Sequence, residues 1–232
     1  MRNRKKSYTQ DELTNSPFII REAKEHIGKW NELFGNTNPI YIEIGCGKGS
    51  FIKGMAKKHP NINFIGMEKE SAIVAMAARL LAGTDAQTGE TVEPTEPITN
   101  AKLIRGNAEE LLAYFAQGEV AGIYLNFSDP WPKSRTAKRR LTYKDFLARY
   151  ATALAPYGGI ALKTDNEGLY RFSVEELANA NWQLQSQTED LHSTDFHTSG
   201  DNIKTEYETK FSSMGMPIYR VEAQKPMAKT PL

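Results

Sequence analysis

Three glycines alternate with other residues in the segment E-I-G-C-G-K-G at positions 43–49, directly after a short apolar run. Glycine has no Cβ, so Gly45, Gly47 and Gly49 permit a tight turn and let a ligand approach bare backbone. The dinucleotide fingerprint G-x-G-x-x-G is not met, because the third glycine comes one residue early. A ligand with a pyrophosphate is therefore not indicated, whereas the carboxylate of Glu43 suits a ligand that carries positive charge.

Two further polar residues follow apolar runs and suit a nucleoside. Glu68 follows the run at 63–67, and a carboxylate there can accept hydrogen bonds from both ribose hydroxyls. A solvated glutamate is the alternative, because charged residues follow directly at 69–70. Asn107 follows the next apolar run, where its side chain can cap a helix and can also bond an adenine.

The segment I-Y-L-N-F-S-D-P-W-P-K at 123–133 leads from an apolar run into two prolines, which stiffen the chain and exclude helix. It presents Asp129 and the aromatic surface of Trp131 where a strand should end. Five cations fall within the next eight residues, namely Lys133, Arg135, Lys138, Arg139 and Arg140. A charge run is often only a solvated face, but its position beside this loop favours a phosphate-bearing substrate such as nucleic acid.

The elements that must position these residues alternate between strand and helix. Apolar runs predict seven strands, at 40–44, 63–67, 102–105, 120–127, 160–163, 182–189 and 218–224. Helical periodicity predicts helices at 48–58, 70–82, 108–117, 142–154 and 168–180. This alternation indicates an α/β fold with a mostly parallel seven-stranded sheet and helices on both faces, in which ligands bind beyond the carboxyl ends of the strands.

Residues 1–38 read as an N-terminal extension, and residues 39–232 as the main domain. The extension begins with a basic arm, Arg2, Arg4, Lys5 and Lys6, and continues into a short helical stretch. Its apolar residues are expected to pack on a core: Phe18, Ile19, Ile20, Ile27, Trp30, Leu33 and Phe34. Residues 83–100 are rich in Gly, Thr, Pro and acids, and indicate a surface loop without an evident function.

Composition excludes several classes of protein. The 232 residues are 40% hydrophobic and 25% charged, which is ordinary for a globular domain, and the net charge is only +1. No apolar run approaches the roughly 20 residues that span a bilayer, and the charged N-terminus is not a secretory signal. Cys46 is the single cysteine, which excludes intramolecular disulfides and favours the cytoplasm. His192 and His197 flank Asp195, but with no third well-spaced ligand they read as exposed loop histidines, and no metal is expected.

The motif E-x-G-x-G-x-G resembles the first motif of S-adenosylmethionine-dependent methyltransferases. Together with N-F-S-D-P-W-P-K, K-R-R-L-T, K-T-D at 163–165 and T-E-Y-E at 205–208, it makes the chain similar to bacterial tRNA (guanine-N7-)-methyltransferases from about residue 17 to 222. The resemblance implies a Rossmann-like class I methyltransferase fold that methylates a guanine of the tRNA variable loop, nucleotide 46. Asn107 departs from the family, which often has Asp there, and the 83–100 loop is longer than usual.

The resemblance also implies residue roles. The S-adenosylmethionine pocket would be lined by Glu43, Gly45, Gly47, Gly49, Glu68, Asn107 and Asp129. Asp129 is also the implied catalytic position. The substrate nucleotide would be contacted by Lys133, Asp165, Thr205, Glu206, Tyr207 and Glu208, and the RNA backbone by Arg135, Lys138, Arg139 and Arg140. A monomer and a homodimer both fit the sequence, and the resemblance favours the dimer.

Guanine N7 has a free lone pair, so its methylation needs orientation and charge stabilisation but no base. Asp129 or Asp165 could accept hydrogen bonds from guanine N1–H and N2–H, and the sequence does not choose between them. Trp131 or Tyr207 could stack on the exposed base, although Trp131 also reads as a buried anchor of its loop.

Three other functions stay open at this point. They are a methyltransferase for another RNA or a small molecule, a non-catalytic RNA-binding protein on the same fold, and an NAD-dependent oxidoreductase. The missing dinucleotide fingerprint and the Asp-Pro-Trp-Pro loop argue against the last.

Overall fold

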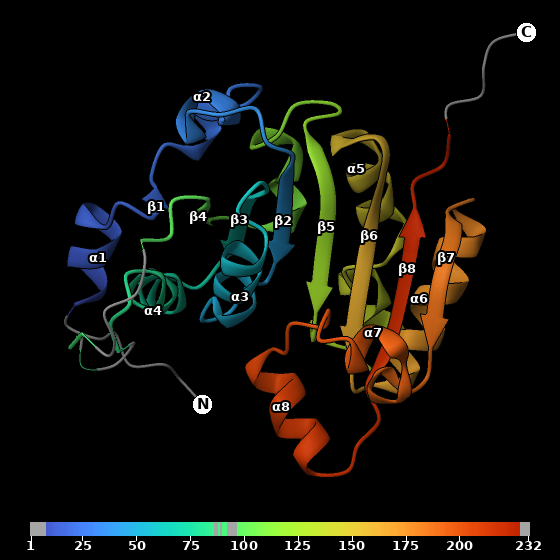
Figure 1. Cartoon of the computed structure of the whole chain (residues 1–232). Helices are drawn as coiled ribbons and strands as arrows, with labels where there is room; N and C mark the ends of the chain where they lie inside the picture. The colour runs from blue at the N-terminus through green and yellow to red at the C-terminus, as the bar shows by residue number, and fades with distance from the viewer. Residues whose placement is uncertain (1–7, 86–87, 89, 92–96, 228–232) are drawn as a thin grey trace, which may run out of the picture. The chain divides into compact units, whose positions relative to one another are not determined.

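A computed structural model describes residues 8–85, 88, 90–91 and 97–227 (Figure 1). The basic arm at residues 1–6 and the middle of the predicted 83–100 loop lie outside the described residues. The chain divides into two compact units, Met1–Phe115 and Ala116–Leu232, which are treated separately below. The division into a 1–38 extension and a 39–232 domain stays a prediction.

The first unit contains four parallel strands. They are β1 (Ile19–Ile20), β2 (Ile40–Ile44), β3 (Asn63–Glu68) and β4 (Ala101–Arg105), in the order β1-β4-β3-β2. Ile42, Ile65 and Ile104 are completely buried at the centres of their strands. Strands that are covered on both faces are expected to be continuously apolar, as the sequence showed. Glu68 stands at the last position of β3.

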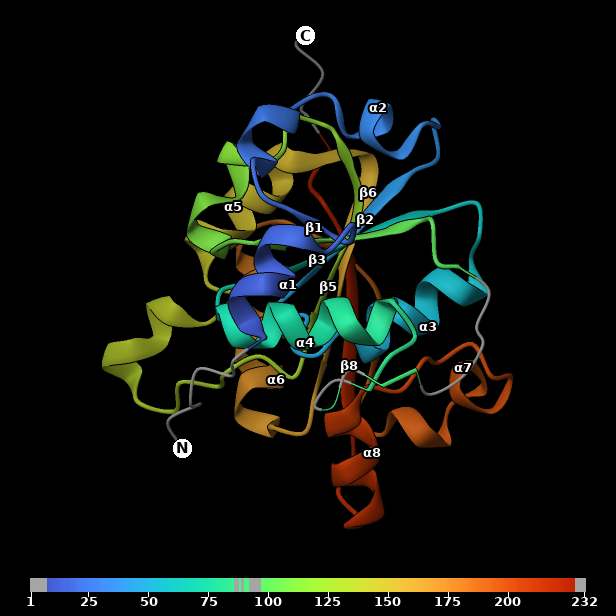
Figure 2. The same ribbon diagram turned by 90° about the vertical axis from the view of Figure 1, so that its left-hand side faces the viewer.

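Helices of the first unit cover these strands. They are α1 (Thr9–Asn15), η1 (Ala23–His26), α2 (Trp30–Phe34), α3 (Ser50–Lys58), α4 (Ser71–Leu81) and η2 (Ala108–Ala113). α3 buries Phe51, Ile52 and Met55, which share one helical face. α1 lies alongside α4 in Figure 2, and Glu12 accepts a hydrogen bond from Arg79 at 2.7 Å between them.

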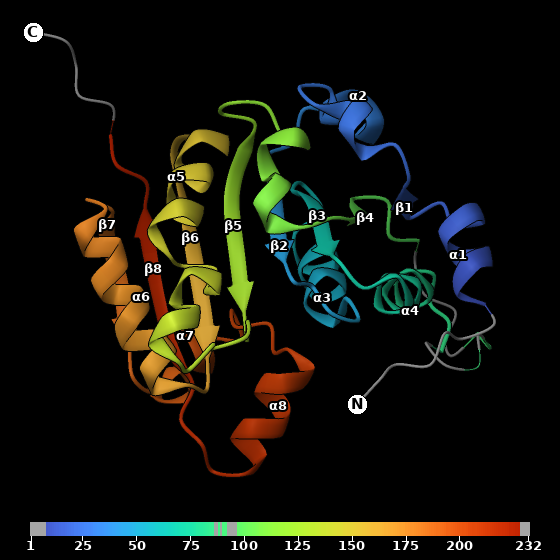
Figure 3. The ribbon, with the colours of Figure 1, turned by 180° about the vertical axis from the view of Figure 1, so that it is seen from behind.

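The second unit contains the other four strands. They are β5 (Val120–Asn126), β6 (Leu154–Thr164), β7 (Gln183–Thr188) and β8 (Tyr219–Gln224), in the order β5-β6-β8-β7. β5 and β6 are parallel, whereas β8 runs antiparallel to both of its neighbours. The helices are η3 (Ser134–Arg139), α5 (Lys144–Ala153), α6 (Glu167–Asn179), η4 (Leu191–Ser193), α7 (Asp195–Thr198) and α8 (Glu206–Ser213). α8 lies beyond the carboxyl ends of β5 and β6 (Figures 1 and 3).

The predicted α/β alternation is confirmed, with several local differences. One is that β6 begins at Leu154, where the predicted helix was still to run, and not at 160. The described residues form eight strands instead of seven, because Ile19 and Ile20 pair with β4. The helix predicted at 108–117 is a 3-10 helix that ends at Ala113, and the main-chain oxygen of Tyr114 instead accepts a hydrogen bond from the Trp30 indole at 2.8 Å. Ile27 is 40% exposed, so its prediction as a core residue was wrong.

No helix within the described part of the chain has the length and apolar character needed to cross a bilayer.

Candidate active site

The glycine turn of the first unit follows β2. The main-chain N–H groups of Gly45 and Cys46 donate to the Met67 carbonyl at 2.8 and 3.1 Å, which ties the turn to the end of β3. Gly45, Gly47 and Gly49 have φ angles of 77°, 54° and 82°, a region that favours glycine. A Cβ built on Gly45 or Gly47 would meet no atom within 4 Å. The backbone at these two positions therefore borders open space, as close approach of a ligand requires.

Glu68 braces this turn. Its Oε2 accepts a hydrogen bond from Gly47 N–H at 3.3 Å, while Oε1 accepts from the N–H groups of Lys69 and Glu70 at 2.8 and 3.0 Å. The carboxylate is half-buried and is held at the carboxyl end of β3. Glu43 is 2% exposed and lies in β2 next to the turn. The structure thus brings the predicted acidic residues to the turn at the ends of neighbouring strands.

Cys46 lies between these acidic residues as a packing group. Burial raises the pKa of its thiol well above the ordinary value, and the charges of Glu43 and Glu68 act in the same direction. A Cβ on Gly66 of β3 would lie 2.8 Å from the sulfur, so the absence of a side chain at position 66 makes room for Cys46. The thiol is protonated and enclosed, which agrees with its reading as a small residue that fits the turn.

Asn107 begins η2. Its Oδ1 accepts a hydrogen bond from Glu109 N–H at 3.2 Å, which is the predicted cap. The exposed side chain also carries an Nδ2 amine, which can donate to a ring nitrogen of a purine.

The loop after β5 presents an exposed Asp129 in the second unit. Two residues of this loop have left-handed backbone angles, Phe127 at φ 51° and Trp131 at φ 42°. This conformation costs a non-glycine residue free energy, so it persists only where the surrounding structure imposes it. Phe127 N–H donates to the Lys163 carbonyl of β6 at 2.8 Å, which fixes the beginning of the loop.

Arg140 fixes the other end of the loop. Its Nε and Nη2 donate to the carbonyl oxygens of Pro130 and Trp131 at 3.0 and 3.1 Å, and its guanidinium lies 4.2 Å from the centre of the Phe172 ring. The sequence predicted that Arg140 contacts the RNA backbone, but in this structure its guanidinium is bonded to the loop. Arg140 therefore acts as a brace of the Asp129 loop in this structure.

The remaining cations of the basic segment are exposed. Lys133, Arg135, Lys138 and Arg139 have solvent-facing side chains, and η3 projects from the second unit in Figure 2. The Arg139 guanidinium lies 4.8 Å from the centre of the Trp131 ring. Trp131 is half-buried, so neither of its two alternatives, base stacking or a buried anchor, is eliminated.

The T-E-Y-E segment divides into exposed and buried residues. Glu206 and Tyr207 are exposed at the beginning of α8. Thr205 Oγ1 instead caps α8 by accepting from Glu208 N–H at 2.9 Å, and Glu208 is completely buried beside Lys163 at 2.7 Å. Substrate contact by Thr205 and Glu208 stays a prediction, but both side chains are already engaged within the protein. Asp165 is half-buried directly after β6.

His192 and His197 are not the isolated, exposed histidines that the sequence suggested. Both are half-buried, their rings stack with centres 4.2 Å apart, and their ligand atoms lie within 4.8 Å of a Glu208 oxygen. The third group is Glu208, which follows His192 by 16 residues and belongs to α8. A divalent cation there would lie against the Lys163 ammonium, which already neutralises the Glu208 carboxylate. This argues for a hydrogen-bonded cluster, and the absence of a metal stays a prediction.

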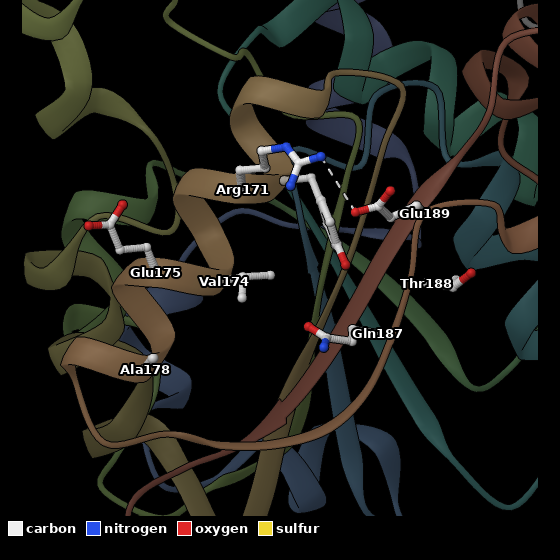
Figure 4. A pocket seen from close by; sticks show the side chains of 8 residues that line it. Arg171, Val174, Glu175, Ala178, Gln187, Thr188 and Glu189 are labelled. Carbon is white, nitrogen blue, oxygen red and sulfur yellow. Dashed lines mark ion pairs between the residues drawn. The ribbon is translucent and has the colours of Figure 1, made fainter.

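A cavity of about 570 Å³ lies between α6 and β7 of the second unit, away from the predicted site residues (Figure 4). Two of its charged side chains form an ion pair, because Arg171 lies 3.6 Å from Glu189, and Arg171 also lies 2.8 Å from Glu167. None of the predicted cofactor or substrate residues lines this cavity.

Comparisons with known proteins identify the family of the chain. The family model "Putative methyltransferase" matches residues 37–221. The chain is 46% identical to the tRNA (guanine-N(7)-)-methyltransferase of Bacillus cytotoxicus over 97% of both chains. It is 44% identical to the protein of the same name from Halalkalibacterium halodurans, over 97% of this chain and 96% of that one.

Solved structures give the fold. A 16S rRNA methyltransferase has a TM-score of 0.61 at 12% identity, with 86% of this chain and 94% of that chain covered. A variant of the 16S rRNA (adenine(1408)-N(1))-methyltransferase of Catenulisporales acidiphilia, solved with its cosubstrate S-adenosylmethionine, has a TM-score of 0.57 at 18% identity. It covers 88% of this chain and 93% of its own. The predicted Rossmann-like methyltransferase fold is thereby confirmed.

Proposed function

This chain belongs to the family of tRNA (guanine-N7-)-methyltransferases, and we propose that it methylates N7 of guanine 46 in the variable loop of tRNA. The enzyme is a methyltransferase, and S-adenosylmethionine is its methyl donor. The product nucleoside is 7-methylguanosine. The observation that carries the proposal is the exposed Asp129 on a braced loop, followed directly by a projecting basic segment.

The first unit fits S-adenosylmethionine. The bare backbone at Gly45 and Gly47 borders open space that a ligand can occupy. In this proposal Glu68 accepts from the ribose hydroxyls, Asn107 bonds the adenine, and Glu43 balances the positive charge of the amino acid portion. Gly49 lets α3 approach α4, since a Cβ there would lie 3.1 Å from the Ala77 Cβ. The donor supplies an electrophilic methyl group on a sulfonium.

The second unit provides the residues for the guanine. N7 needs no deprotonation, so the protein must hold the base in line with the methyl group and stabilise the positive charge that develops on the ring. Asp129 or Asp165 accepts from guanine N1–H and N2–H, which selects guanine over adenine. Tyr207 is 57% exposed and offers its ring for stacking, while Lys133 and Glu206 flank the nucleotide.

The direct test uses purified protein, labelled S-adenosylmethionine and three acceptors: unmodified tRNA, ribosomal RNA and free guanosine. We expect transfer to tRNA alone, with 7-methylguanosine identified by mass. Transfer to guanosine or to ribosomal RNA would support the alternative substrates. Binding of tRNA without transfer would support a non-catalytic RNA-binding protein.

Replacing Glu68 with alanine is expected to weaken S-adenosylmethionine binding at least about 10-fold. Hydrogen bonds to a charged group contribute roughly 1.5–3 kcal/mol, and about 1.4 kcal/mol corresponds to a tenfold change in Kd. Isothermal titration calorimetry measures the affinity. Glu70→Ala is the matched control, because this neighbouring acid is exposed and its side chain does not cap α4. Equal affinity in the Glu68 variant and the wild type would remove Glu68 from the cofactor site.

Replacing both Arg135 and Lys138 with alanine is expected to weaken tRNA binding and flatten its salt dependence. Each lost phosphate contact lowers the slope of log K against log salt by roughly 0.7–0.9. The measurement is the tRNA affinity at several salt concentrations. Removal of two exposed charges from α3, Lys57→Ala and Lys58→Ala, controls for the change in net charge. An unchanged slope in the Arg135 and Lys138 variant would show that these two cations do not contact RNA phosphates and are only solvent-exposed charges.

We also propose that the protein acts in the cytoplasm, where tRNA is modified, and that it is either a monomer or a homodimer. The family resemblance favours the homodimer. Light scattering after size exclusion decides between the two masses.

A further inference from the structure

The second unit contains a buried ion pair that methyl transfer itself does not require. Glu208 is 0% exposed and Lys163 is 5% exposed, and they form an ion pair with 2.7 Å between Nζ and Oε2. Burial alone would raise the pKa of Glu208, but Lys163, His192 and Asn202 hold it below the ordinary value. Glu208 is therefore an ionised carboxylate inside the protein.

Three segments meet at this carboxylate. His192 of η4 donates from Nε2 to Oε1 at 2.9 Å, and Asn202 donates from Nδ2 to the same oxygen. Lys163 of β6 also donates to Asn202 Oδ1 at 3.1 Å and to the Ile203 carbonyl at 2.8 Å. The cluster therefore bonds the strand, η4 and the connection into α8 to one another. The carboxylate already accepts from three side-chain donors and is completely buried, so it is not accessible to a nucleotide in this structure.

The main chain of Lys163 also contacts the Asp129 loop. Its carbonyl accepts from Phe127 N–H, two residues before Asp129, while its side chain holds the first turn of α8. The Phe127 ring stacks with Tyr207 and Phe211 of α8 at 6.3 and 6.1 Å between ring centres. One residue thus sets both the origin of the Asp129 loop and the place of the exposed Tyr207.

Energetics indicate what the ion pair contributes. Charges that are taken out of water lose hydration, so a buried pair often stabilises a fold no better than apolar side chains of similar volume. Its hydrogen bonds are directional, however, and an apolar pair lacks them. The geometry of α8 is therefore the property that depends on the ion pair itself.

We propose that Lys163 and Glu208 are positioning residues that hold Tyr207 beside the Asp129 loop to receive the target guanine. This rests on the proposed function, and it moves Glu208 from substrate contact to support. The pair acts through Tyr207, so its loss should impair capture of tRNA and leave the cofactor site of the first unit unchanged.

The test compares Glu208→Gln, Lys163→Met and the apolar double variant Lys163→Met with Glu208→Leu. Kinetics give KM for tRNA and kcat, calorimetry gives S-adenosylmethionine stoichiometry, and thermal melting gives Tm. We expect KM for tRNA to rise at least about 10-fold in every variant that folds, with one cofactor bound per chain. We expect the double variant to recover Tm but not KM. The control is Glu167→Gln with Arg171→Met, which removes an exposed ion pair of the same unit.

A second measurement separates positioning from a merely structural role. Tyr207→Ala should raise KM by itself, and adding it to the double variant should raise KM little further, because coupled residues are not additive. The proposal is overturned if the double variant has the wild-type KM, if it fails to fold, or if the Tyr207 effect adds in full. A wild-type protein that does not methylate tRNA would instead refute the proposed function, and the outcomes are thereby distinguishable.

Discussion

Replacing Asp129 with alanine is expected to reduce methyl transfer to tRNA at least about 100-fold while the protein stays folded. The side chain is exposed at the tip of a braced loop, so its removal leaves the core intact. Its proposed contacts orient the reacting base, and misplacement of a reactant by about 1 Å can lower a rate about 100-fold. Single-turnover kinetics with saturating S-adenosylmethionine measures the loss.

The variant Asp129→Asn tests whether the carboxylate itself is required for methyl transfer. Asparagine keeps the shape but replaces one acceptor with a donor, so it cannot accept from guanine N1–H and N2–H with one oxygen each. We expect a loss close to that of alanine. Calorimetry separates the two predicted roles, because a rise in the S-adenosylmethionine Kd would assign Asp129 to the cofactor. Near-normal turnover in both variants would exclude Asp129 from the mechanism and leave Asp165 to recognise the guanine.

Replacing Arg140 with alanine is expected to lower kcat at least about 10-fold without flattening the salt dependence of tRNA binding. The variant loses two charged hydrogen bonds to the carbonyls of Pro130 and Trp131, each of which contributes roughly 1.5–3 kcal/mol. The Asp129 loop then loses its fixed geometry. Arg140→Lys should fail to rescue, because an ammonium does not reproduce the planar fork of a guanidinium.

Arg139 provides the matched control for this prediction. It is adjacent in sequence and carries the same charge, but its guanidinium lies over Trp131 and faces solvent. Arg139→Ala should therefore weaken tRNA binding and change the salt slope while leaving kcat near the wild-type value. Identical behaviour of the two variants would return Arg140 to the RNA-binding surface.

Local patterns predicted where the proposed cofactor residues lie in the first unit. The glycine turn and Glu68 follow strands whose apolar runs are unmistakable, and parallel strands bring their carboxyl ends to one edge. Gly45 and Glu68 are thus near each other for reasons that are visible in the sequence. Asn107 caps η2 as its residue type and position indicated.

The support of the substrate half could not be predicted in the same way. Glu208 pairs with a lysine 45 positions earlier and with His192, and no short motif encodes those contacts. The sequence grouped Arg140 with its cationic neighbours because composition reports charge, whereas its partners are main-chain carbonyls. The K-T-D motif drew attention to Asp165, whereas the sequence indicated no role for Lys163 of the same motif, for which we propose a positioning role.

The central claim is tested most directly by tRNA transcripts that differ at one base. Wild-type protein, S-adenosylmethionine and transcripts with guanine or adenine at nucleotide 46 would be compared, with modified nucleosides located by mass. The account predicts one 7-methylguanosine per intact transcript, at nucleotide 46, and none in the adenine transcript. Equal methylation of both transcripts, or a methyl group at another nucleotide, would contradict it.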